Sequence, residues 1–449
     1  MNDTLAQDYA SEISSSQEGK YRDGLTKSEW TEATKFNSLD WGWIIIGIGG
    51  AIGAGIVFLP VQVGLQGLWI FILSAILGYP ALYMFQKLFI NTMLEAKVYT
   101  DYPAVLTDYI GKNFSAMISF LYFAFLMIYV CVYSTVLNND SVAFMDTFGV
   151  TQSLGFSESQ LARNPLYGFL LILALTTLGS RGERALMRIS TFMVLVKICV
   201  VIGLAVLMFP RWNIANIMAL PDIWTVVKQT IIMMPFTMVS ILILQSLSPM
   251  IISYRTNYKS LEVARYRGLR AFNITFFILL FAVMFFTVSL NLGLSHEQAV
   301  EAYAKNISAV AIVAQSSDGF SLKIFSLILN IFAVVTAYIA VSLAFRDVFY
   351  GLAINILSRF IPGEKINKNY VQHGIFLFTV ITCWLVIVFN APVLSYTSIG
   401  SPIMGLIGCM VPAYIVYMTP SLKKYQTISI WYIIFAGLLL IISPFLAFS

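Results

Sequence analysis

The stretch GIGGAIGAGIVFLP, Gly47 to Pro60, lies inside the first long apolar segment of the chain, Trp41 to Gly64. It holds five glycines within nine residues, although each glycine inside a helix costs about 1 kcal/mol relative to alanine. Two explanations fit such a run in a membrane: small residues let a neighbouring helix pack closely, or the helix breaks and exposes backbone amides and carbonyls. The small residues occur on every face, which a one-sided packing motif does not need, so the sequence favours a broken helix.

The composition identifies the class of protein. Of the 449 residues, 59% are hydrophobic and 11% are charged, and many apolar runs reach the ~18 to 20 residues that span hydrocarbon. We therefore expect an all-α integral membrane protein with about eleven transmembrane helices. The net charge of +5 is distributed along the chain, which bears on membrane orientation and argues against nucleic-acid binding. The predicted spans are Trp41 to Gly64, Leu68 to Asn91, Ser115 to Leu137, Pro165 to Gly179, Ile189 to Phe209, Thr225 to Ile251, Ala271 to Leu292, Phe320 to Phe345, Val371 to Phe389, Val393 to Met418 and Ile428 to Phe448.

The distribution of basic residues predicts the orientation. With the N-terminus inside, most of the 27 Lys and Arg lie in cytoplasmic segments, as the positive-inside rule requires. Residues 1–35 then form a largely flexible cytoplasmic segment, residues 36–449 form the transmembrane domain, and the C-terminus lies outside. The four cysteines fall in apolar runs without metal-ligand spacing, so we expect neither a disulfide nor a metal site.

Two segments outside the spans have helical patterns. Tyr99 to Ile110 is amphipathic and is expected to lie along the cytoplasmic face. Ser295 to Gln315 begins with a serine cap and an acidic first turn, and is expected to pack as an external helix over the bundle. An ordinary structured loop and a gating lid are both open interpretations of the second segment.

The sixth span, Thr225 to Ile251, is also unusual, because its prolines and hydroxyl side chains gather in its second half. Ser248 followed by Pro249 is typical of a helix start, and a start inside a span implies a break before it. Spans one and six would thus be discontinuous, and each opens a group of five spans. An odd number of spans inverts the second copy, which predicts a five-plus-five inverted repeat with repeat one at 41–209, repeat two at 225–418 and an extra helix at 428–448.

Several motifs resemble the bacterial hydroxy and aromatic amino acid permeases, and in particular their serine/threonine permease branch. The resemblance runs from about Trp41 to the end of the chain. The stretches that carry it are Gly50 to Pro60, Leu247-Ser248-Pro249, Leu121-Tyr122-Phe123, Tyr133 to Asn139, Asn390-Ala391-Pro392, Gly400-Ser401-Pro402 and Thr419 to Tyr425.

The resemblance implies the LeuT-like fold of the amino acid/polyamine/organocation superfamily, and proton-coupled uptake of a small neutral amino acid across the bacterial cytoplasmic membrane. The partners would be the amino acid, protons and the lipid bilayer, with no cofactor besides the coupling ion and no nucleic acid. The sequence does not determine the oligomeric state, and a monomer is compatible with it. Relatives usually carry aromatic residues where Ile243 and Gln245 stand, so the chain departs from the family pattern there.

An amino acid carries a carboxylate and an ammonium, and helix ends can bind both. Free amides around Ala54 to Ile56 would bind the carboxylate, and carbonyls of Ala51 to Gly53 and of Leu244 to Ser246 would bind the ammonium. Tyr122 and Tyr129 share a face of span three with Tyr133, as a pocket wall or as interhelical packing. Gln245, Ser246 and Ser248 would contact a polar substrate side chain. The predicted substrate site therefore comprises Ala51, Ile52, Gly53, Ala54, Gly55, Ile56, Tyr122, Tyr129, Leu244, Gln245, Ser246 and Ser248.

Lys197, near the middle of span five, is the predicted proton-coupling residue. A charged lysine at that depth costs at least ~2.5 kcal/mol, so it needs a partner or a role. Its position resembles the span-five lysine of distant proton-coupled members of the superfamily, which replaces the cation that sodium-coupled members hold between spans one and eight. The protonated side chain would brace the inner half of span one, and loss of the proton would release it. Alternatively, it snorkels to the headgroups or only ties down free carbonyls.

Three classes of function can be compared with the sequence. A proton-coupled symporter for a serine-like or threonine-like amino acid fits best, with aromatic or other neutral substrates and sodium coupling as alternatives. A membrane amino-acid sensor would need a sizeable soluble output domain, which the sequence does not contain. An enzyme is not expected, because the chain has no HExxH, no serine-histidine arrangement and no paired buried carboxylates.

Overall fold

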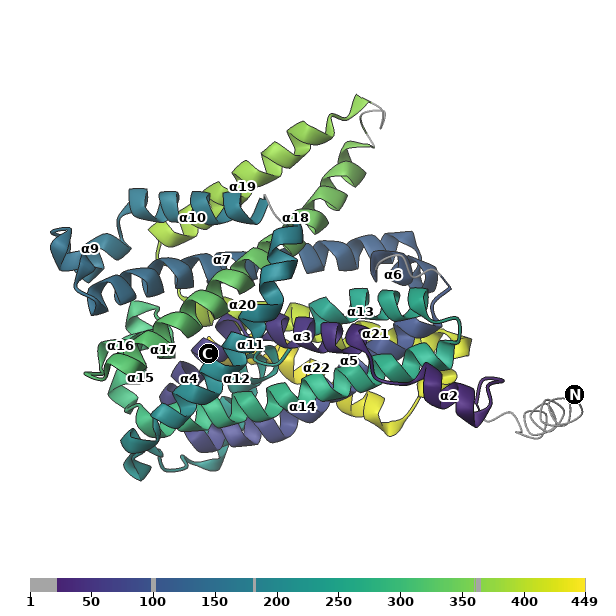
Figure 1. Cartoon of the computed structure of the whole chain (residues 1–449), viewed down its shortest axis with the longest axis horizontal. Helices are drawn as coiled ribbons and strands as arrows, with labels where there is room; N and C mark the ends of the chain where they lie inside the picture. The colour runs from purple at the N-terminus through teal and green to yellow at the C-terminus, as the bar shows by residue number, and fades with distance from the viewer. Residues whose placement is uncertain (1–21, 98–101, 181–182, 359, 361–364, 449) are drawn as a thin grey trace, which may run out of the picture.

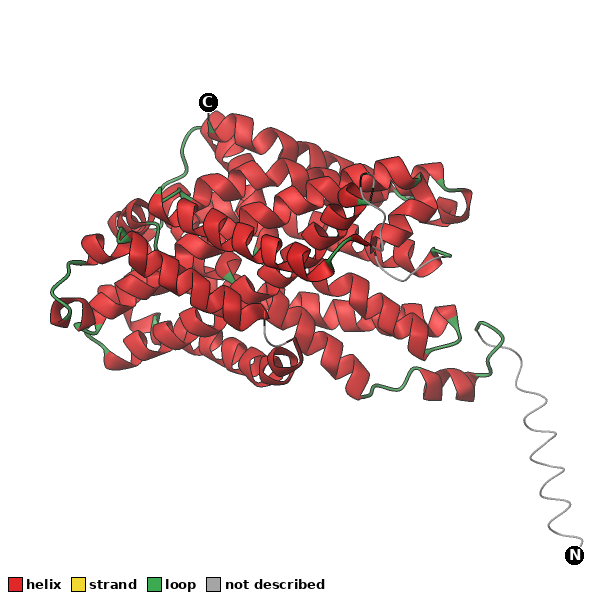
Figure 2. Cartoon of the chain, turned by 90° about the horizontal axis from the view of Figure 1, so that it is seen from above, coloured by secondary structure: helices red, strands yellow, loops and turns green. Residues whose placement is uncertain are grey.

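The computed structural model of the chain describes residues 22–97, 102–180, 183–358, 360 and 365–448. Every regular element in these residues is a helix, apart from one isolated backbone bridge between Arg22 and Leu25 (Figures 1 and 2). The predicted all-α class is therefore confirmed. Residues 1–21 of the predicted N-terminal segment and the first residues of the predicted Tyr99 to Ile110 helix lie outside the described part of the chain.

Long apolar helices make up most of the structure. Within the described residues, eight segments are long and apolar enough to cross a membrane, two further helix pairs pass the same test as bent pairs, and Pro165–Gly179 is a shorter apolar helix. The predicted membrane class is thus confirmed, whereas the count of eleven and the inverted repeat stay predictions. The eight segments are Leu68–Glu95, Asn113–Thr147, Phe192–Arg211, Leu261–Gly293, Phe320–Ile354, Lys368–Val388, Val393–Met418 and Ile428–Ala447.

The helices follow the predicted spans closely, with three main differences. The helix of span eight ends at Leu357, twelve residues beyond the predicted Phe345. The helix of span three extends ten residues beyond the predicted Leu137, and the helix of span seven begins ten residues before the predicted Ala271. In these cases further turns continue the helix beyond the apolar stretch, so hydropathy marks the membrane-spanning part and not the helix end. The helices are α2 (Lys27–Ala33), α3 (Ser38–Ala51), α4 (Ala54–Gln66), α5 (Leu68–Glu95), α6 (Tyr102–Ile110), α7 (Lys112–Thr147), α8 (Val150–Ser153), α9 (Glu158–Ala162), α10 (Pro165–Ser180), α11 (Glu183–Leu207), α12 (Ile223–Val239), α13 (Leu244–Asn257), α14 (Leu261–Gly293), α15 (His296–Lys305), α16 (Ala309–Gln315), α17 (Phe320–Asn330), α18 (Thr336–Leu357), α19 (Lys368–Val388), α20 (Val393–Met404), α21 (Val411–Met418) and α22 (Ile428–Ala447).

Two spans contain a π-helical turn instead of a break. Ile331–Val335 joins α17 to α18, and Gly405–Met410 joins α20 to α21. At the second turn a Cβ on Gly405 would lie 2.7 Å from the backbone oxygen of Gly437 on α22, so only glycine allows this close approach. The extra helix α22 therefore packs directly against this turn.

The helices pack as two groups around the middle of the molecule. One group contains α3, α4, α5, α12, α13 and α14, and the other contains α7, α10, α18 and α19. In Figure 1, α10 and α19 form the upper edge, away from α14. Helices α11 and α20 lie between the groups: α11 contacts α3 and α17, and α20 contacts α7 and α12.

The predicted segment Ser295 to Gln315 forms two helices. Ser295 caps α15 in a capping box with Gln298, as the sequence predicts, but the chain then turns at Asn306, whose φ is 53°, and Ser308 caps α16. Short polar residues tolerate this left-handed conformation, which ends α15. Figure 1 shows α15 and α16 at the opposite end of the bundle from α2, so we call these ends the α15 end and the α2 end.

Buried polar side chains hold α15 and α16 in place. The carboxylate of Asp140 on α7 is fully buried and accepts hydrogen bonds from the Ser308 amide, at 2.8 Å, and from Asn330 on α17. The neighbouring Asn139 donates to Asn390 Oδ1 at 3.1 Å and to the backbone oxygen of Lys305 at 3.2 Å. These bonds join the α15–α16 connection to α7, to α17 and to the connection between α19 and α20.

A buried charge cluster holds α3 at the α2 end. Asp40 is 0% exposed and accepts hydrogen bonds from Tyr254 Oη on α13, at 2.8 Å, and from Arg267 and Arg270 on α14. Its second role is in the capping box of α3, where it accepts from the Asn37 amide at 2.9 Å. The carboxylate thus joins the start of α3 to α13 and α14.

We predict that Asp40→Ala destabilises the protein by about 3–5 kcal/mol, because it leaves Arg267 buried without its countercharge. Thermal unfolding of the purified variant in detergent measures the effect. The matched control is Glu32→Ala, since Glu32 pairs with Lys35 at 3.9 Å on the surface, where both side chains are exposed. A surface pair contributes little, so the control should unfold close to wild type. Equal midpoints for the two variants would contradict the prediction.

Candidate functional site

The first predicted break is present between α3 and α4. Helix α3 ends at Ala51 and α4 begins at Ala54, with a bend of 44° between them. Gly53 is extended, at φ −147° and ψ −153°, and its carbonyl accepts from the Ile56 amide at 3.1 Å. The amides of Ala54 and Gly55 are among the first donors of α4, which no carbonyl within a helix can reach. The broken first span is confirmed.

The second predicted break is present between α12 and α13, but not where the sequence placed it. Helix α12 ends at Val239 and α13 begins at Leu244, with a bend of 41°. The predicted helix start at Ser248 and Pro249 is wrong, since both residues lie inside α13.

The break lies earlier because another helix supplies the cap. The Ile243 amide donates to Oε1 of Gln86 on α5 at 3.1 Å, so the free donor at the start of α13 is satisfied without a local capping residue. It also follows that Leu244 to Ser246 lie at the amide end of α13. The prediction that their carbonyls are free to bind an ammonium is therefore wrong. The carbonyl end that faces the break belongs to α12, where Thr237 O accepts from Ser240 Oγ at 2.6 Å and Val239 O accepts from the Leu242 amide at 3.3 Å.

The two breaks lie against each other through glycine. A Cβ on Gly55 would lie 3.3 Å from both the backbone oxygen of Val239 and the Cα of Ser240, at the end of α12. A Cβ on Gly53 would lie 2.8 Å from Tyr133 Oη. Gly55 therefore serves close packing of two backbones, and the same contact brings the amide end of α4 next to the carbonyl end of α12.

A narrow cavity opens at this contact. Of the predicted site residues, Gly55 and Tyr129 line it. The sequence did not place the others in the site, although Tyr133 belongs to the predicted aromatic face of span three. The remaining lining residues are Phe58, Val132, Tyr133, Phe236, Val239, Val393, Leu394 and Thr397.

The other predicted site residues all lie outside the cavity lining. Gln245 is exposed, Ser248 and Tyr122 are half-buried, and Ser246 Oγ lies 3.2 Å from where a Cβ on Gly50 would be. Thus α13 packs on α3 through Ser246 and presents Gln245 away from the cavity. Three further predicted residues, Ala51, Ile52 and Ile56, are buried beside the break.

Lys197 on α11 reaches the end of α3. Its side chain is buried, with 1% exposed, and Nζ donates to the backbone oxygens of Gly49, at 3.1 Å, and Ile52, at 3.0 Å. An ammonium at the carbonyl end of a helix is favoured by the helix dipole. Lys197 therefore bonds to carbonyls that the break leaves without helical partners. The Gly53 carbonyl is bonded to the Ile56 amide. Of the carbonyls predicted to bind the substrate ammonium, the Ala51 carbonyl is therefore the one that remains.

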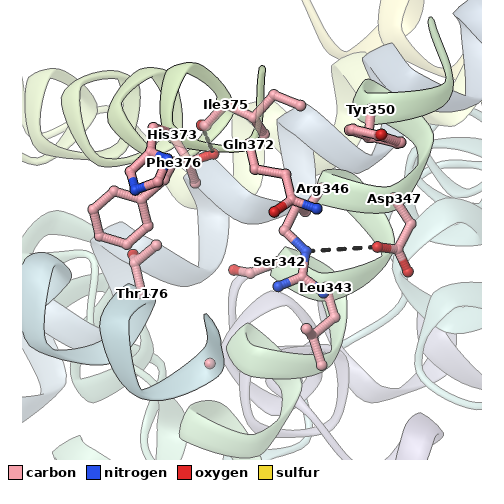
Figure 3. Close-up of a pocket in the computed structure, with 12 residues that line it drawn as sticks. Thr176, Ser342, Leu343, Arg346, Asp347, Tyr350, Gln372, His373, Ile375 and Phe376 are labelled. Carbon is pink, nitrogen blue, oxygen red and sulfur yellow. Dashed lines mark hydrogen bonds and ion pairs between the residues drawn. The ribbon is translucent and has the colours of Figure 1, made fainter. Parts of the chain in front are cut away.

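A larger cavity lies elsewhere in the molecule. It has a volume of about 360 Å³ and is lined by α10, α18 and α19, with Arg346 and Asp347 paired at 3.5 Å in its wall (Figure 3). None of the predicted site residues lines it, and neither broken helix contributes to it. Size alone therefore does not identify the site.

In the described part of the chain, no group of three His, Cys, Asp or Glu side chains could hold a metal ion.

Comparison with known proteins agrees with this geometry. The chain is 53% identical over 431 residues to a serine transporter of Escherichia coli O157:H7, covering 95% of the chain and 96% of the relative. It is 25% identical over 415 residues to the serine transporter SdaC of Escherichia coli K12, covering 90% and 93% of the two chains. It is 24% identical over 419 residues to the threonine/serine transporter TdcC of Yersinia enterocolitica, covering 88% and 92%.

Comparison with solved structures gives the fold. The crystal structure of MhsT in complex with L-phenylalanine matches with a TM-score of 0.55 at 14% identity, over 90% of this chain and 98% of that one. This likeness confirms the LeuT-like fold that the sequence predicts. No family model matches the chain.

We predict that Gly55→Val destabilises the protein by about 1–3 kcal/mol, because the added carbons meet the backbone at the end of α12. Thermal unfolding of the purified protein measures it. Gly42→Val on α3 is the matched control, since a Cβ there would meet nothing within 4 Å. If both variants unfold together, Gly55 does not serve packing.

Proposed function

This chain belongs to the serine/threonine permease branch of the hydroxy and aromatic amino acid permease family, and on that basis we propose that it carries serine or threonine by proton-coupled symport. Family membership makes it an amino acid transporter in a membrane, and not an enzyme. The identity of 53% over 95% of the chain to a serine transporter supports a small hydroxyl-bearing substrate.

The observation that carries the proposal is the meeting of two opposite helix ends in one cavity. Gly55, at the amide end of α4, and Val239, at the carbonyl end of α12, both line it. A helix N-terminus carries roughly half a positive charge and a C-terminus roughly half a negative charge. The cavity has a volume of about 20 Å³ in this structure, so it must widen to admit an amino acid. The carboxylate of a zwitterion would then bind the amides of Ala54 and Gly55, and its ammonium would bind the Ala51 carbonyl and the carbonyl end of α12. No charged side chain is needed.

The remaining walls favour a small side chain with a hydroxyl group. Phe58, Val132 and Phe236 are apolar, whereas Tyr129, Tyr133 and Thr397 bring hydroxyl groups into the narrow lining. Thr397 Oγ1 donates to the Val393 carbonyl at 3.2 Å and keeps lone pairs for a substrate hydroxyl. Aromatic and other neutral amino acids are the alternative substrates, and the larger of them would require the cavity to widen further than serine does.

We predict that unlabelled serine and threonine compete with labelled serine uptake more strongly than tryptophan and tyrosine do. A site with buried hydroxyl partners rejects an analogue that leaves them unpaired, since each unpaired group costs ~1–3 kcal/mol. The test is uptake into proteoliposomes against a panel of unlabelled amino acids. Stronger competition by the aromatic amino acids would overturn the assignment of the substrate.

The proposed orientation has the α2 end in the cytoplasm and the α15 end outside, in a bacterial cytoplasmic membrane. The α2 end carries Arg255, Arg265, Arg267 and Arg270, and the positive-inside rule favours such residues on the cytoplasmic side. Import then moves the substrate from the α15 end to the α2 end. The proposed direction of transport, into the cytoplasm, follows the proton gradient.

Proton coupling rests on Lys197. Its ammonium occupies the carbonyls of Gly49 and Ile52, where a bound cation would otherwise stabilise the broken span. This supports protons over the alternative of sodium as the coupling ion. Nζ can bond to both carbonyls at once because an ammonium has three donors, so the brace on α3 depends on whether Nζ holds its proton.

We predict that Lys197→Met and Lys197→Ala abolish uphill uptake while leaving exchange of substrate across the membrane. A pH gradient of one unit drives about tenfold accumulation through a one-proton symporter, and a variant without the proton carrier should only equilibrate. The measurement is labelled serine in proteoliposomes with an imposed pH gradient, with Lys323→Met as the control lysine variant. Uphill accumulation by either Lys197 variant would show that Lys197 is not the proton carrier.

A further inference from the structure

One fully buried carboxylate among the apolar helices lacks a countercharge. Asp140 on α7 is 0% exposed and forms no ion pair with any described residue. Asp40, which is equally buried, is instead bonded to Arg267 and Arg270. A charge buried away from water is costly unless it is paired, and a group without a pair becomes neutral instead. No such pair holds the charge on Asp140, so a proton can bind there.

The partners of Asp140 suit the neutral acid as well as the carboxylate. Its Oδ1 accepts from the Ser308 amide at 2.8 Å, and its Oδ2 accepts from Nδ2 of Asn330. An asparagine amide offers donors on one side and an acceptor on the other, and the amide oxygen of Asn330 accepts no hydrogen bond from a described residue. If this amide turns over, its oxygen can accept the O–H of a protonated Oδ2, while the Ser308 bond remains. Both protonation states of Asp140 therefore keep their hydrogen-bond partners.

A small cavity leads toward this carboxyl group from the α15 end. It has a volume of about 150 Å³, and its lining includes Asn139 and Ile307, the chain neighbours of Asp140 and Ser308. Arg163, also in its wall, is exposed, so the cavity opens at the surface. Water at this end therefore comes within one residue of the buried bond.

The other titratable groups at the α15 end leave Asp140 isolated. On α7 and the segments packed against it, these groups are Asp146, Glu158, Arg163, Tyr167, Lys305, Asp318, Lys323 and Tyr396. None of them bonds to Asp140. Lys305 pairs with Glu158 at 3.1 Å and with Glu301 at 2.9 Å. A proton on Asp140 is therefore not exchanged with a bonded partner, and it comes from water.

The charge on Asp140 affects how firmly α16 is held. The Ser308 amide lies at the start of α16, which packs against α4, α7 and α17 (Figure 1). A hydrogen bond to an ionised acceptor is roughly twice as strong as one to a neutral acceptor. Proton binding therefore loosens the first turn of α16, and α4, which carries Gly55 in the central cavity, loses part of its support.

We propose that Asp140 is a second proton-binding site, loaded from the α15 end, whose proton loosens α16 and favours widening of the central cavity. Its effect on transport rests on the proposed function, whereas proton binding does not. Hydronium at the α15 end gives its proton to Oδ2 and leaves water, and the same O–H bond breaks when the proton returns to water. This proton tunes the entry of substrate to the pH and is distinct from the coupling proton on Lys197.

The first test detects the proton itself. Infrared spectra of the purified chain in lipid nanodiscs should show the C=O stretch of a buried carboxylic acid growing as the pH falls from about 8 to about 5, and Asp140→Asn should lack it. Asp146→Asn, the same change on the same helix, is the matched control and should keep the band. Identical spectra of wild type and Asp140→Asn would overturn the proposal, as would a band that does not change with pH.

The second test separates this site from coupling. In proteoliposomes of Lys197→Met with equal pH on both sides, exchange of labelled serine should rise about fivefold from about pH 8 to about pH 5. Adding Asp140→Asn should keep exchange fast at every pH, whereas adding Asp146→Asn should leave the pH dependence in place. A pH dependence that survives Asp140→Asn would refute the role of Asp140. No serine transport by wild type would refute the proposed function and leave the infrared result standing.

A third measurement needs no variant. Hydrogen exchange of the wild-type chain, corrected for the intrinsic effect of pH on amide exchange, should show about fivefold less protection of the Ser308 amide at low pH. The Ile243 amide, bonded to the uncharged Gln86, is the internal control and should keep its protection. Protection of Ser308 that does not change with pH would contradict the proposal.

Discussion

The bond between Lys197 and the end of α3 is the contact on which the rest of the site depends. A helix that breaks inside a membrane leaves carbonyls that neither lipid nor the next turn can satisfy. Nζ of Lys197 donates hydrogen bonds to the carbonyls of Gly49 and Ile52, so a single side chain from α11 stabilises the break in the middle of the bundle. Because the partner is an ammonium, the stability of the break is tied to a group that can lose a proton.

A broken helix creates a binding site without charged side chains. The amide end of α4 and the carbonyl end of α12 meet where Gly55 packs on Val239, so the glycine that shapes the packing also sets the distance between two opposite partial charges. The same backbone contact thus serves the fold and the proposed recognition of a zwitterion. The close packing at Gly55 and the proposed binding at the break therefore both depend on the same contact between α4 and α12.

Buried polar contacts hold the two ends of the bundle differently. At the α2 end, Asp40 joins α3 to α13 and α14, which brings the halves of both broken spans at this end into one cluster with α14. At the α15 end, Asp140 and Asn139 join the α15–α16 connection to α7 and its neighbours. The α3 half of the first span is thereby fixed to one group of helices, while the α15–α16 segment is fixed to the other.

The sequence by itself determined the helical membrane class, the break in the first span and the presence of Lys197 in an apolar segment. These follow from local chemistry: apolar length, clustered glycines, and a charge that hydrocarbon does not tolerate alone. The break in the sixth span was predicted, but at the wrong residues. The amide at the start of α13 is capped by Gln86 from α5, so the sequence around Ile243 contains no capping residue that would mark the helix start. Only the tertiary structure decided which side chains share the cavity. Tyr133, Phe236 and Thr397 come from three helices far apart in the chain, and the rotation of each helix, set by its packing, decides that they face the break while Gln245 does not.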